Sequence, residues 1–251
     1  TFGGCWGVSA RLARTTALLL DDDVLIDAGS GVGDLELAQL RRIDRAFLTH
    51  SHLDHVTALP LLLDTVGADR DEPVTVHAQE ATLEALRQHV FNDVIWPDFG
   101  RIPSPERPFL RYPPLAVGAV WSQGERRIRS IPVSHVVPTV GYLVSGPNGS
   151  FAFSGDTTVT DEFWRVLNAC TDLRHVIIET SFLDEERELA RVSRHLCPSM
   201  LAGELRKLKA GPQVHITHLM PGHEDATMRE IARHLPERLP RQLVRGQTIE
   251  L

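Results

Sequence analysis

The sequence alternates short apolar runs with stretches in which apolar residues recur at helical spacing. Near the start, residues 16–20 and 24–27 flank an acidic turn at 21–23 and predict a β-hairpin. Further apolar runs predict strands at residues 45–49, 74–77, 128–133, 140–144, 151–154, 176–179 and 214–217. Helical spacing predicts helices at about residues 34–40, 56–66, 81–90, 161–169, 198–208 and 226–234. Strands interspersed with helices in this way predict an α/β layered fold.

Closely spaced glycines follow the second strand of the hairpin, in the sequence Asp-Ala-Gly-Ser-Gly-Val-Gly at residues 27–33. Such glycines can form a phosphate-binding loop, but this segment lacks the lysine of a P-loop, and its spacing differs from the dinucleotide-binding fingerprint. A tight turn that needs the backbone freedom of glycine is the preferred interpretation.

Proline dominates one long segment in the middle of the chain. Six prolines lie from Pro97 to Pro114, and their fixed φ angles and missing N–H groups disfavour regular structure. Residues 91–114 are therefore predicted to form a loop or lid. Nothing in the composition marks a second core, so the whole chain, residues 1–251, is expected to form a single domain.

Composition and charge restrict the expected partners. Hydrophobic residues make up 42% of the chain and charged residues 24%, as in soluble globular proteins, and no apolar stretch is long enough to span a bilayer. The formal net charge is −7, and the 26 basic residues form no long run that would follow a phosphate backbone. We therefore expect a small-molecule substrate, with no large nucleic acid and no membrane as partner.

The cysteines bear on the cellular compartment. Cys5, Cys170 and Cys197 are widely spaced and odd in number, so they form no disulfide framework, and we expect them to be packing residues. This usage suits a reducing compartment and favours the cytoplasm. The chain begins at Thr1 rather than at a methionine, so an export signal upstream would instead place the protein in the periplasm.

The densest group of chemically active side chains follows the strand predicted at 45–49. His50, His52, Asp54 and His55 place three imidazoles and one carboxylate within six consecutive residues. This spacing suits two adjacent metal ions better than one, because a single tetrahedral ion would leave neighbouring imidazoles strained or unpaired. The alternative is a loop of solvated or core-packed histidines. The density favours a dinuclear metalloenzyme.

Two ions need more ligands than this segment offers, and three other residues stand in a similar setting. His135, Asp156 and His218 each follow an apolar strand and a small polar residue, so their side chains are expected to meet in one cleft at the sheet edge. His223, five residues after His218, is the only plausible substitute ligand. The other histidines, at positions 77, 89, 175, 215 and 234, are expected to be structural or exposed.

The segment from His50 to His55 resembles the HxHxDH signature of the metallo-β-lactamase superfamily without departure. The resemblance implies an αββα sandwich, in which two mixed β-sheets are flanked by helices and the site lies at one edge between the sheets. It also implies two ligand sets: His50, His52 and His135 for one ion, Asp54, His55 and His218 for the other, and Asp156 as the bridge between them.

Within this superfamily, several segments resemble class II 3',5'-cyclic-nucleotide phosphodiesterases. Residues 52–56 resemble the HLDH signature of that family, residues 91–97 its FNxxIWP stretch and residues 154–157 its SGDT element. Residues 178–182 and 193–196 resemble its IETSF and SxHL elements. The Val-Val-Pro-Thr segment after His135 departs from the pattern, where a glycine and a serine-rich stretch are expected.

Glu179 and His195 lie in the last two of these elements. Related phosphodiesterases of this fold, including ribonuclease Z, pair such a glutamate with a histidine near the scissile phosphate. The resemblance implies that Glu179 orients His195, and that the protonated imidazole stabilises charge at phosphorus and protonates the departing 3'-oxygen. Asp54 is counted with them as a catalytic residue as well as a ligand. The alternative for His195 is a surface residue that caps the helix predicted at 198–208.

These resemblances imply a dinuclear metal-dependent phosphodiesterase that hydrolyses cAMP, with cGMP as a further candidate, to the 5'-nucleotide. A hydroxide held between two divalent ions would attack phosphorus. Histidine-rich ligation favours Zn²⁺, although Mn²⁺ or Fe²⁺ could also occupy such a site. Homodimers are common on this fold, so a homodimer is a further expectation.

Substrate contacts are expected from the proline-rich loop and from the segment after His135. Trp96 and Phe99 could stack on a purine base, and the alternative is that they pack the loop onto the core. Asn92 and Thr139 complete the predicted substrate-binding residues.

Two other functions remain open on the same fold. A ribonuclease Z-like endonuclease would use the same metals, but that family grips tRNA with a protruding basic arm, and no such insertion is apparent between the predicted strands. A non-catalytic sensor or scaffold would keep metals for stability. Its usual mark is the loss of a ligand, whereas the ligand set here is complete.

Overall fold

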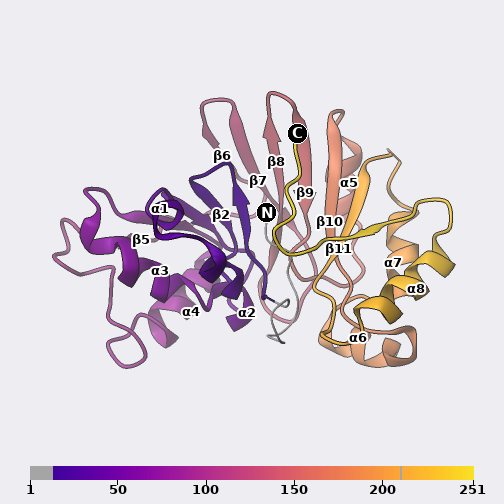
Figure 1. Ribbon diagram of the computed structural model, residues 1–251, viewed down its shortest axis with the longest axis horizontal. Coiled ribbons are helices and arrows are strands. Elements are labelled where there is room, and N and C mark those ends of the chain that lie inside the picture. The colour runs from indigo at the N-terminus through magenta and orange to yellow at the C-terminus, as the bar shows by residue number, and fades with distance from the viewer. Residues whose placement is uncertain (1–13, 210) are drawn as a thin grey trace.

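Two β-sheets lie face to face, and helices cover the outer side of each sheet (Figure 1). The computed structural model describes residues 14–209 and 211–251. Cys5, which was expected to be a packing residue, lies outside these ranges. The αββα sandwich implied by the resemblance is confirmed.

The first sheet has five strands and leads into the histidine-rich segment. Its order is β1 (Leu18–Leu20), β2 (Val24–Ile26), β3 (Arg45–Phe47), β4 (Val74–His77) and β5 (Leu110–Arg111). β1 and β2 form the predicted antiparallel hairpin, and the other neighbours are parallel. Four helices lie with this sheet: α1 (Leu37–Leu40), α2 (Leu53–Val56), α3 (Leu59–Val66) and α4 (Glu80–His89).

The second sheet has seven strands and is also mixed. Its order is β12 (Arg241–Gln242), β11 (Gln213–Thr217), β10 (Leu173–Glu179), β9 (Gly149–Phe153), β8 (Val140–Gly146), β7 (Arg126–Pro132) and β6 (Val120–Gln123). Strands β9 to β12 are parallel, so the residues that follow β9, β10 and β11 emerge at one edge. The accompanying helices are α5 (Glu162–Asn168), α6 (Arg187–Ser193), α7 (Pro198–Leu205) and α8 (Glu224–His234).

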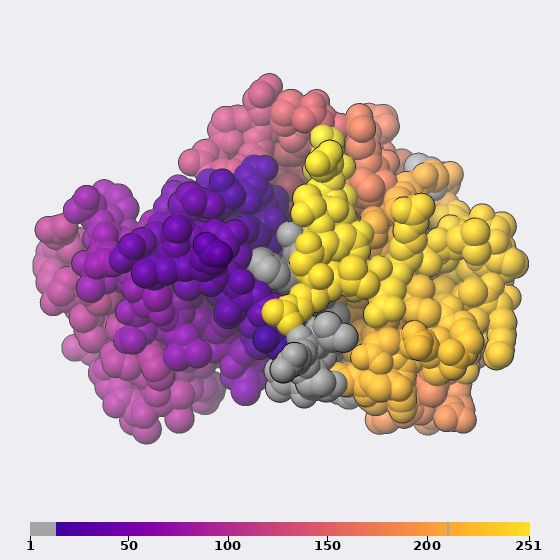
Figure 2. All heavy atoms as spheres, in the orientation of Figure 1, coloured from indigo at the N-terminus to yellow at the C-terminus, as the bar shows by residue number. Residues whose placement is uncertain are grey.

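Apolar side chains alternate along the strands and fill three layers. In β10, Val176 and Ile178 pack against the helices of the second sheet, whereas Ile177 packs between the two sheets. In β2, Leu25 faces the helices of the first sheet and Ile26 faces the opposite sheet. A one-residue shift would exchange the two faces of a strand, so this pattern fixes the register. The C-terminal segment, yellow in Figure 2, crosses the front of the molecule between the two halves.

All the predicted strands are present, with ends that move by up to three residues. Among the strands and α-helices of the described residues, the pattern does not predict β5, β6, β12, α6 and the four-residue helix α2. β5 and β12 have only two residues each, β6 is mostly exposed at a sheet edge, and α6 buries only Ala190. Elements this short or this exposed carry too little periodic apolar signal to be recognised.

The helix predicted at 56–66 is α3, and a separate short helix, α2, precedes it. α2 ends at Val56, and α3 begins at Leu59 with Pro60 in its first turn, where a missing backbone N–H is tolerated. His52 is the N-cap residue of α2, and Asp54 and His55 lie within that helix. Three of the predicted ligands are therefore carried by one short helix.

The proline-rich segment 91–114 is mostly irregular, as predicted, but it is firmly attached to the first layer. β5 pairs with β4 at the edge of the first sheet. Phe91, Phe99 and Leu110 are buried in the layer between that sheet and its helices. These contacts anchor the segment to the core.

The glycine-rich turn after β2 contains a short 3₁₀ helix, Ser30–Asp34. Gly29 has an ordinary φ of −71°, so the predicted need for backbone freedom is wrong at this position. The constraint is space: a Cβ on Gly29 would lie 2.3 Å from the carbonyl oxygen of Asp54 and 2.5 Å from that of Thr16. Glycine thus lets α2 approach the start of the first sheet closely.

Two further expectations concern the cysteines and the membrane. Cys197 is buried and Cys170 is half-buried against the core of the second sheet, and both are free thiols. Within the described part of the chain, no helix combines the length and apolar character needed to cross a bilayer.

Tyr142 joins the two sheets near the histidine segment, and this contact predicts a loss of stability. Its buried hydroxyl donates a 2.7 Å hydrogen bond to the carbonyl oxygen of Leu48. Tyr142→Phe should lower the free energy of unfolding by about 1–2 kcal/mol, because the buried carbonyl loses its donor while the ring still packs. Tyr112→Phe is the matched control, since the Tyr112 hydroxyl is buried without a hydrogen-bond partner among the described residues. Urea unfolding of both variants measures the difference, and equal losses would contradict the role of the Leu48 contact.

Candidate metal centre

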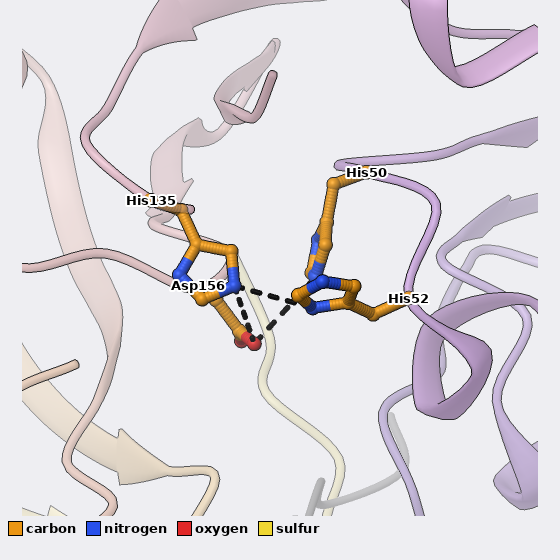
Figure 3. Close-up of side chains that lie close together, drawn as sticks. All are labelled: His50, His52, His135 and Asp156. Atoms are coloured by element: carbon orange, nitrogen blue, oxygen red, sulfur yellow. Dashed lines mark hydrogen bonds and ion pairs between the residues drawn. The ribbon is translucent and has the colours of Figure 1, made fainter. Parts of the chain in front are cut away.

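The seven residues predicted as metal ligands lie together at one edge of the sandwich. They come from the segments that follow β3, β7, β9 and β11, and so from both sheets. They form two groups in which all ligand atoms lie within 4.8 Å of one another: His50, His52, His135 and Asp156 in the first group, and Asp54, His55, Asp156 and His218 in the second. Figure 3 shows the first group, with its side chains converging from opposite sides. The division between groups matches the one that the resemblance implied.

Asp156 belongs to both groups because its two carboxylate oxygens face different partners. Oδ2 lies 3.6 Å from Nε2 of His50 and 3.9 Å from Nε2 of His135. Oδ1 lies 3.3 Å from Nε2 of His55 and 3.4 Å from Nε2 of His218. A carboxylate placed in this way can offer one oxygen to each of two ions.

Unsatisfied atoms at the centre of the cluster show that its residues fit metal ions. Nε2 of His50, Nε2 of His55 and Oδ1 of Asp156 are buried and have no hydrogen-bond partner among the described residues. Leaving a buried polar atom without a partner is costly, and such atoms call for an explanation. Imidazole nitrogens and carboxylate oxygens are ligands of divalent metals such as Zn²⁺. Coordination of a cation would satisfy all three atoms.

Hydrogen bonds behind the cluster orient the histidines of the first sheet. The carboxylate of Asp27 accepts a 2.7 Å hydrogen bond from Nδ1 of His55. The Thr49 hydroxyl donates to Asp27 and lies 3.0 Å from Nδ1 of His50, so it accepts the proton of that nitrogen. Both rings therefore carry their proton on Nδ1 and present Nε2 to the centre. Support of this kind is typical of metal-binding histidines.

The histidines of the second sheet are oriented in the same way. Nδ1 of His218 lies 2.9 Å from the Ser181 hydroxyl, which itself donates to Glu179. Nδ1 of His135 lies 3.1 Å from the carbonyl oxygen of Arg194. His218 and His135 thus also direct Nε2 inward. His52 is the exception, since its Nδ1 lies 3.2 Å from Nε2 of His135.

Two backbone positions allow the second-sheet ligands to enter the cluster. Gly155, just before Asp156, has φ +60°, and a Cβ there would lie 3.0 Å from the side chain of Thr49. His218 itself has φ +62°, an uncommon conformation for a residue with a side chain. Backbone strain of this kind clusters at functional sites.

The cluster distributes its charge unevenly. Burial lowers the pKa of His50 well below its ordinary value. Burial also opposes a charge on His55, but Asp156 and Asp27 outweigh it and raise the pKa of that imidazole well above its ordinary value. At Asp156, desolvation is outweighed by His218 and His55, so the pKa of the carboxyl lies well below its usual range. Asp156 is therefore held as an anion, the form that binds metal ions.

Glu179 and His195 form a buried pair beside the cluster. Oε1 of Glu179 lies 2.7 Å from Nδ1 of His195. The His195 ring lies 4.9 Å from the ring of His135 and 5.4 Å from that of His218, measured between centroids. Burial opposes the charged imidazole, but Glu179 outweighs it and raises the pKa of His195 to about 9. This geometry differs from that of a surface helix cap, the alternative considered for His195.

The four predicted substrate contacts are less well placed. Phe99 is buried between Phe91 and Phe109, so the core-packing alternative applies and the stacking prediction is wrong for this ring. Asn92 uses its amide within the loop, where Oδ1 accepts from two backbone N–H groups and Nδ2 donates to Gln88. Thr139 is buried and donates to a neighbouring carbonyl. Trp96 packs half-buried against the first layer, and its contact with substrate stays a prediction.

Sequence reasoning missed several residues that build the site. Asp27, Thr49, Ser181 and Arg194 hold the ligands but were not singled out. Asp27 follows the apolar strand β2, which is one part of the signal that identified Asp156, but no small polar residue precedes it. His223, the predicted substitute ligand, belongs to neither metal-binding group of the described residues.

Residues 23–240 match the family described as "Beta-lactamase superfamily domain". Because this span covers most of the sequence, the chain belongs to this family, and its two-sheet architecture is the metallo-β-lactamase fold. The metallo-β-lactamase fold protein YhfI from Bacillus subtilis has a similar structure, with a TM-score of 0.79 and 16% identity, covering 100% of this chain and 98% of that one. This fold and the two groups of histidines and aspartates are those of a metal-dependent hydrolase of the superfamily.

Curated relatives carry two different activities in their names. A "Probable 3',5'-cyclic-nucleotide phosphodiesterase" of Yersinia pestis is 29% identical over 210 residues, which cover 72% of this chain and 58% of that protein. A ribonuclease Z of Bradyrhizobium diazoefficiens is 26% identical over 268 residues, which cover 85% of each chain. The chain therefore spans little more than half the length of the Yersinia relative.

Removing the shared carboxylate should affect both groups at once. We expect Asp156→Ala, loaded with excess metal and then freed of unbound metal, to retain less than one ion per chain and to lose activity by about a hundred-fold or more, because both ions lose a ligand. Elemental analysis of the purified variant measures the metal content. Asp71→Ala, which changes a fully exposed aspartate, is the control and should retain the metal content of the unchanged protein. Two ions per chain in the Asp156 variant would rule out the bridge.

Proposed function

We propose that the chain is a dinuclear phosphodiesterase that hydrolyses 3',5'-cyclic nucleotides, cAMP above all, to 5'-nucleotides. The observation that carries phosphodiester hydrolysis is the Glu179–His195 pair, which lies beside both metal-binding groups. The choice of a cyclic nucleotide rests on the surroundings of the ligands and on the Yersinia relative. A proton donor next to a metal centre is an arrangement suited to breaking a P–O bond with a basic leaving group.

The proposal assigns separate tasks to the metals and to the chain. Bound divalent ions would lower the pKa of water toward neutrality and neutralise charge on the phosphate. His50, His52, His55, His135, His218, Asp54 and Asp156 would hold them. The histidine-rich ligand set favours Zn²⁺.

His195 is the proposed general acid. Glu179 accepts the proton of Nδ1 and so turns Nε2 away from itself and fixes the ring orientation. In hydrolysis to the 5'-nucleotide, water oxygen forms a new bond to phosphorus, the bond from phosphorus to the 3'-oxygen breaks, and the 3'-oxygen takes up a proton. This oxygen departs far more readily as an alcohol than as an alkoxide. The proton held by this pair would be delivered to that oxygen.

The surroundings of the ligands favour a small substrate. Leu53, between His52 and Asp54, is 69% exposed, and Val136, next to His135, is 51% exposed. Apolar side chains here offer no contacts to the charged backbone of a long nucleic acid, and the chain carries a net charge of −7. We call the exposed apolar residues beside the ligands, Leu53 and Val136, the rim residues. A compact cyclic nucleotide with a planar base suits such apolar surroundings. The name of the Yersinia relative and the FNxxIWP-like stretch at 91–97 point the same way.

A ribonuclease Z-like activity is the second candidate. The relative from Bradyrhizobium diazoefficiens aligns with 85% of both chains, which is a larger share of its own length than for the Yersinia protein. The same metal centre and the same Glu179–His195 pair could serve a ribonuclease.

Turnover by the metal-loaded protein separates the candidates. The substrates to compare are cAMP, cGMP, a 2',3'-cyclic nucleotide, an aryl phosphodiester and a precursor tRNA. We expect turnover of cAMP that a chelator abolishes and Zn²⁺ restores. Cleavage of the precursor tRNA without turnover of cAMP would favour the second candidate. No turnover of any substrate by protein that binds two ions would refute both and indicate a non-catalytic metal protein.

The general acid should matter most for a poor leaving group. We expect His195→Gln to lower kcat for cAMP on the order of 10²–10⁴-fold, while an aryl phosphodiester, whose leaving group needs little protonation, is affected far less. Kinetics on both substrates measure the contrast, with His89→Gln, an exposed histidine on α4, as control. Equal losses on both substrates with unchanged metal content would argue against proton donation by His195.

A further inference from the structure

Arg194 occupies an unusual position at the end of α6. It has φ +57° and ψ +49°, the left-handed conformation in which helices usually end with glycine. A residue with a long side chain is disfavoured there, so its presence suggests that the side chain has a task. Arg194 precedes His195 directly, and its side chain is exposed.

Two hydrogen bonds join Arg194 to the metal-site residue His135, 59 positions away in the sequence. The carbonyl oxygen of Arg194 accepts the proton of Nδ1 of His135 at 3.1 Å. The Arg194 guanidinium donates through Nη1 to the carbonyl oxygen of His135 at 2.6 Å. The backbone of Arg194 thus contacts the ring of His135, and the side chain of Arg194 contacts the backbone of His135.

The other inward-facing rings have different support. His55 is held by the buried carboxylate of Asp27, and His218 by the buried hydroxyl of Ser181. His135 lies in the loop after β7, outside any helix or strand, and its ring is held by a backbone carbonyl. A carbonyl orients a ring only while the two chain segments keep their spacing. The hydrogen bond from the Arg194 guanidinium to the carbonyl oxygen of His135 is a second link between the same two segments.

We propose that Arg194 is a positioning residue that fixes His135 as a ligand of the first metal group. This inference rests on the metal centre of the proposed function but not on the substrate assigned to it. Groups that orient a metal ligand typically contribute about ten- to one-hundred-fold to metal affinity. Loss of the guanidinium should lower the affinity of the first group for its ion and leave the affinity of the second group unchanged. The first group consists of His50, His52, His135 and Asp156.

Arg194→Gly tests this without disturbing the turn. Glycine favours the left-handed conformation, so the backbone carbonyl that orients His135 stays available while the guanidinium is removed. Arg194→Lys keeps a positive donor and should rescue part of the affinity. Arg191→Ala is the matched control, because Arg191 lies on α6, the helix that Arg194 caps, and forms an exposed salt bridge with Glu188.

Metal titration followed by elemental analysis gives the decisive readout. We expect Arg194→Gly to bind one ion as tightly as the unchanged protein and the other about ten- to one-hundred-fold more weakly. Arg191→Ala should bind both ions normally. Normal binding of both ions by Arg194→Gly would overturn the proposal, as would equal weakening of both ions.

Two further backgrounds identify the ion concerned. The His218→Ala variant lacks a ligand of the second group, so the ion it binds more tightly is that of the first group. Adding Arg194→Gly to this variant should lower the affinity for that ion. In His135→Ala, the second group keeps its ion, and adding Arg194→Gly should change nothing. An equal effect in both backgrounds would show a general loss of structure and would contradict the proposal, even if the single variant folds poorly.

These results are separate from those that test the activity. Protein that binds two ions but hydrolyses no cyclic nucleotide would refute the proposed substrate, while the metal titrations of Arg194→Gly would still decide its role. Conversely, active protein in which Arg194→Gly binds both ions normally would refute only the role of Arg194.

Discussion

The arrangement of the metal centre depends on the buried carboxylate of Asp27. This side chain is fully buried and accepts hydrogen bonds from the backbone N–H and hydroxyl of Thr49 and from His55. Burial raises the pKa of Asp27 despite these donors, which shows that a charge there is costly. A cation bound at Nε2 of His55 would place positive charge on the far side of that ring and lower this cost. One carboxylate therefore connects the end of β2, the start of the histidine segment and helix α2.

The second sheet completes the centre only because the two sheets are held in a fixed relation. Tyr142 spans the gap to Leu48, and Gly155 leaves just enough room for the turn before Asp156 to approach Thr49. Each contact lies within two residues of a ligand. The apolar layer between the sheets thus has a second effect besides stability, since it sets the separation of ligands that come from different halves of the chain.

The ligands could be predicted from the sequence because each follows a local rule. His50 belongs to a contiguous cluster, and His135 follows a recognisable apolar strand, so neither depends on knowing the tertiary structure. Asp27 also follows an apolar strand, but nothing local shows that Thr49 and His55 will surround it. The burial of Phe99 likewise depends on rings that meet it only after folding, and α6 presents mostly polar residues to solvent. The features that could not be predicted from the sequence depend on contacts between segments that are distant in the chain.

Glu179 connects several parts of the candidate metal centre through hydrogen bonds. Its two oxygens accept hydrogen bonds from His195, from the backbone N–H of Thr157 and from the hydroxyl of Ser181. The Ser181 hydroxyl also contacts Nδ1 of His218 and so links Glu179 to that ring. His195 and the two groups of candidate metal ligands are therefore held in a fixed relation to one another by hydrogen bonds within the protein. The rim residues, such as Leu53 and Val136, take no part in this network of Glu179. Substitutions at Leu53 or Val136 would therefore leave the hydrogen bonds of Glu179 unchanged, so the surface around the ligands can vary independently of the residues that hold them.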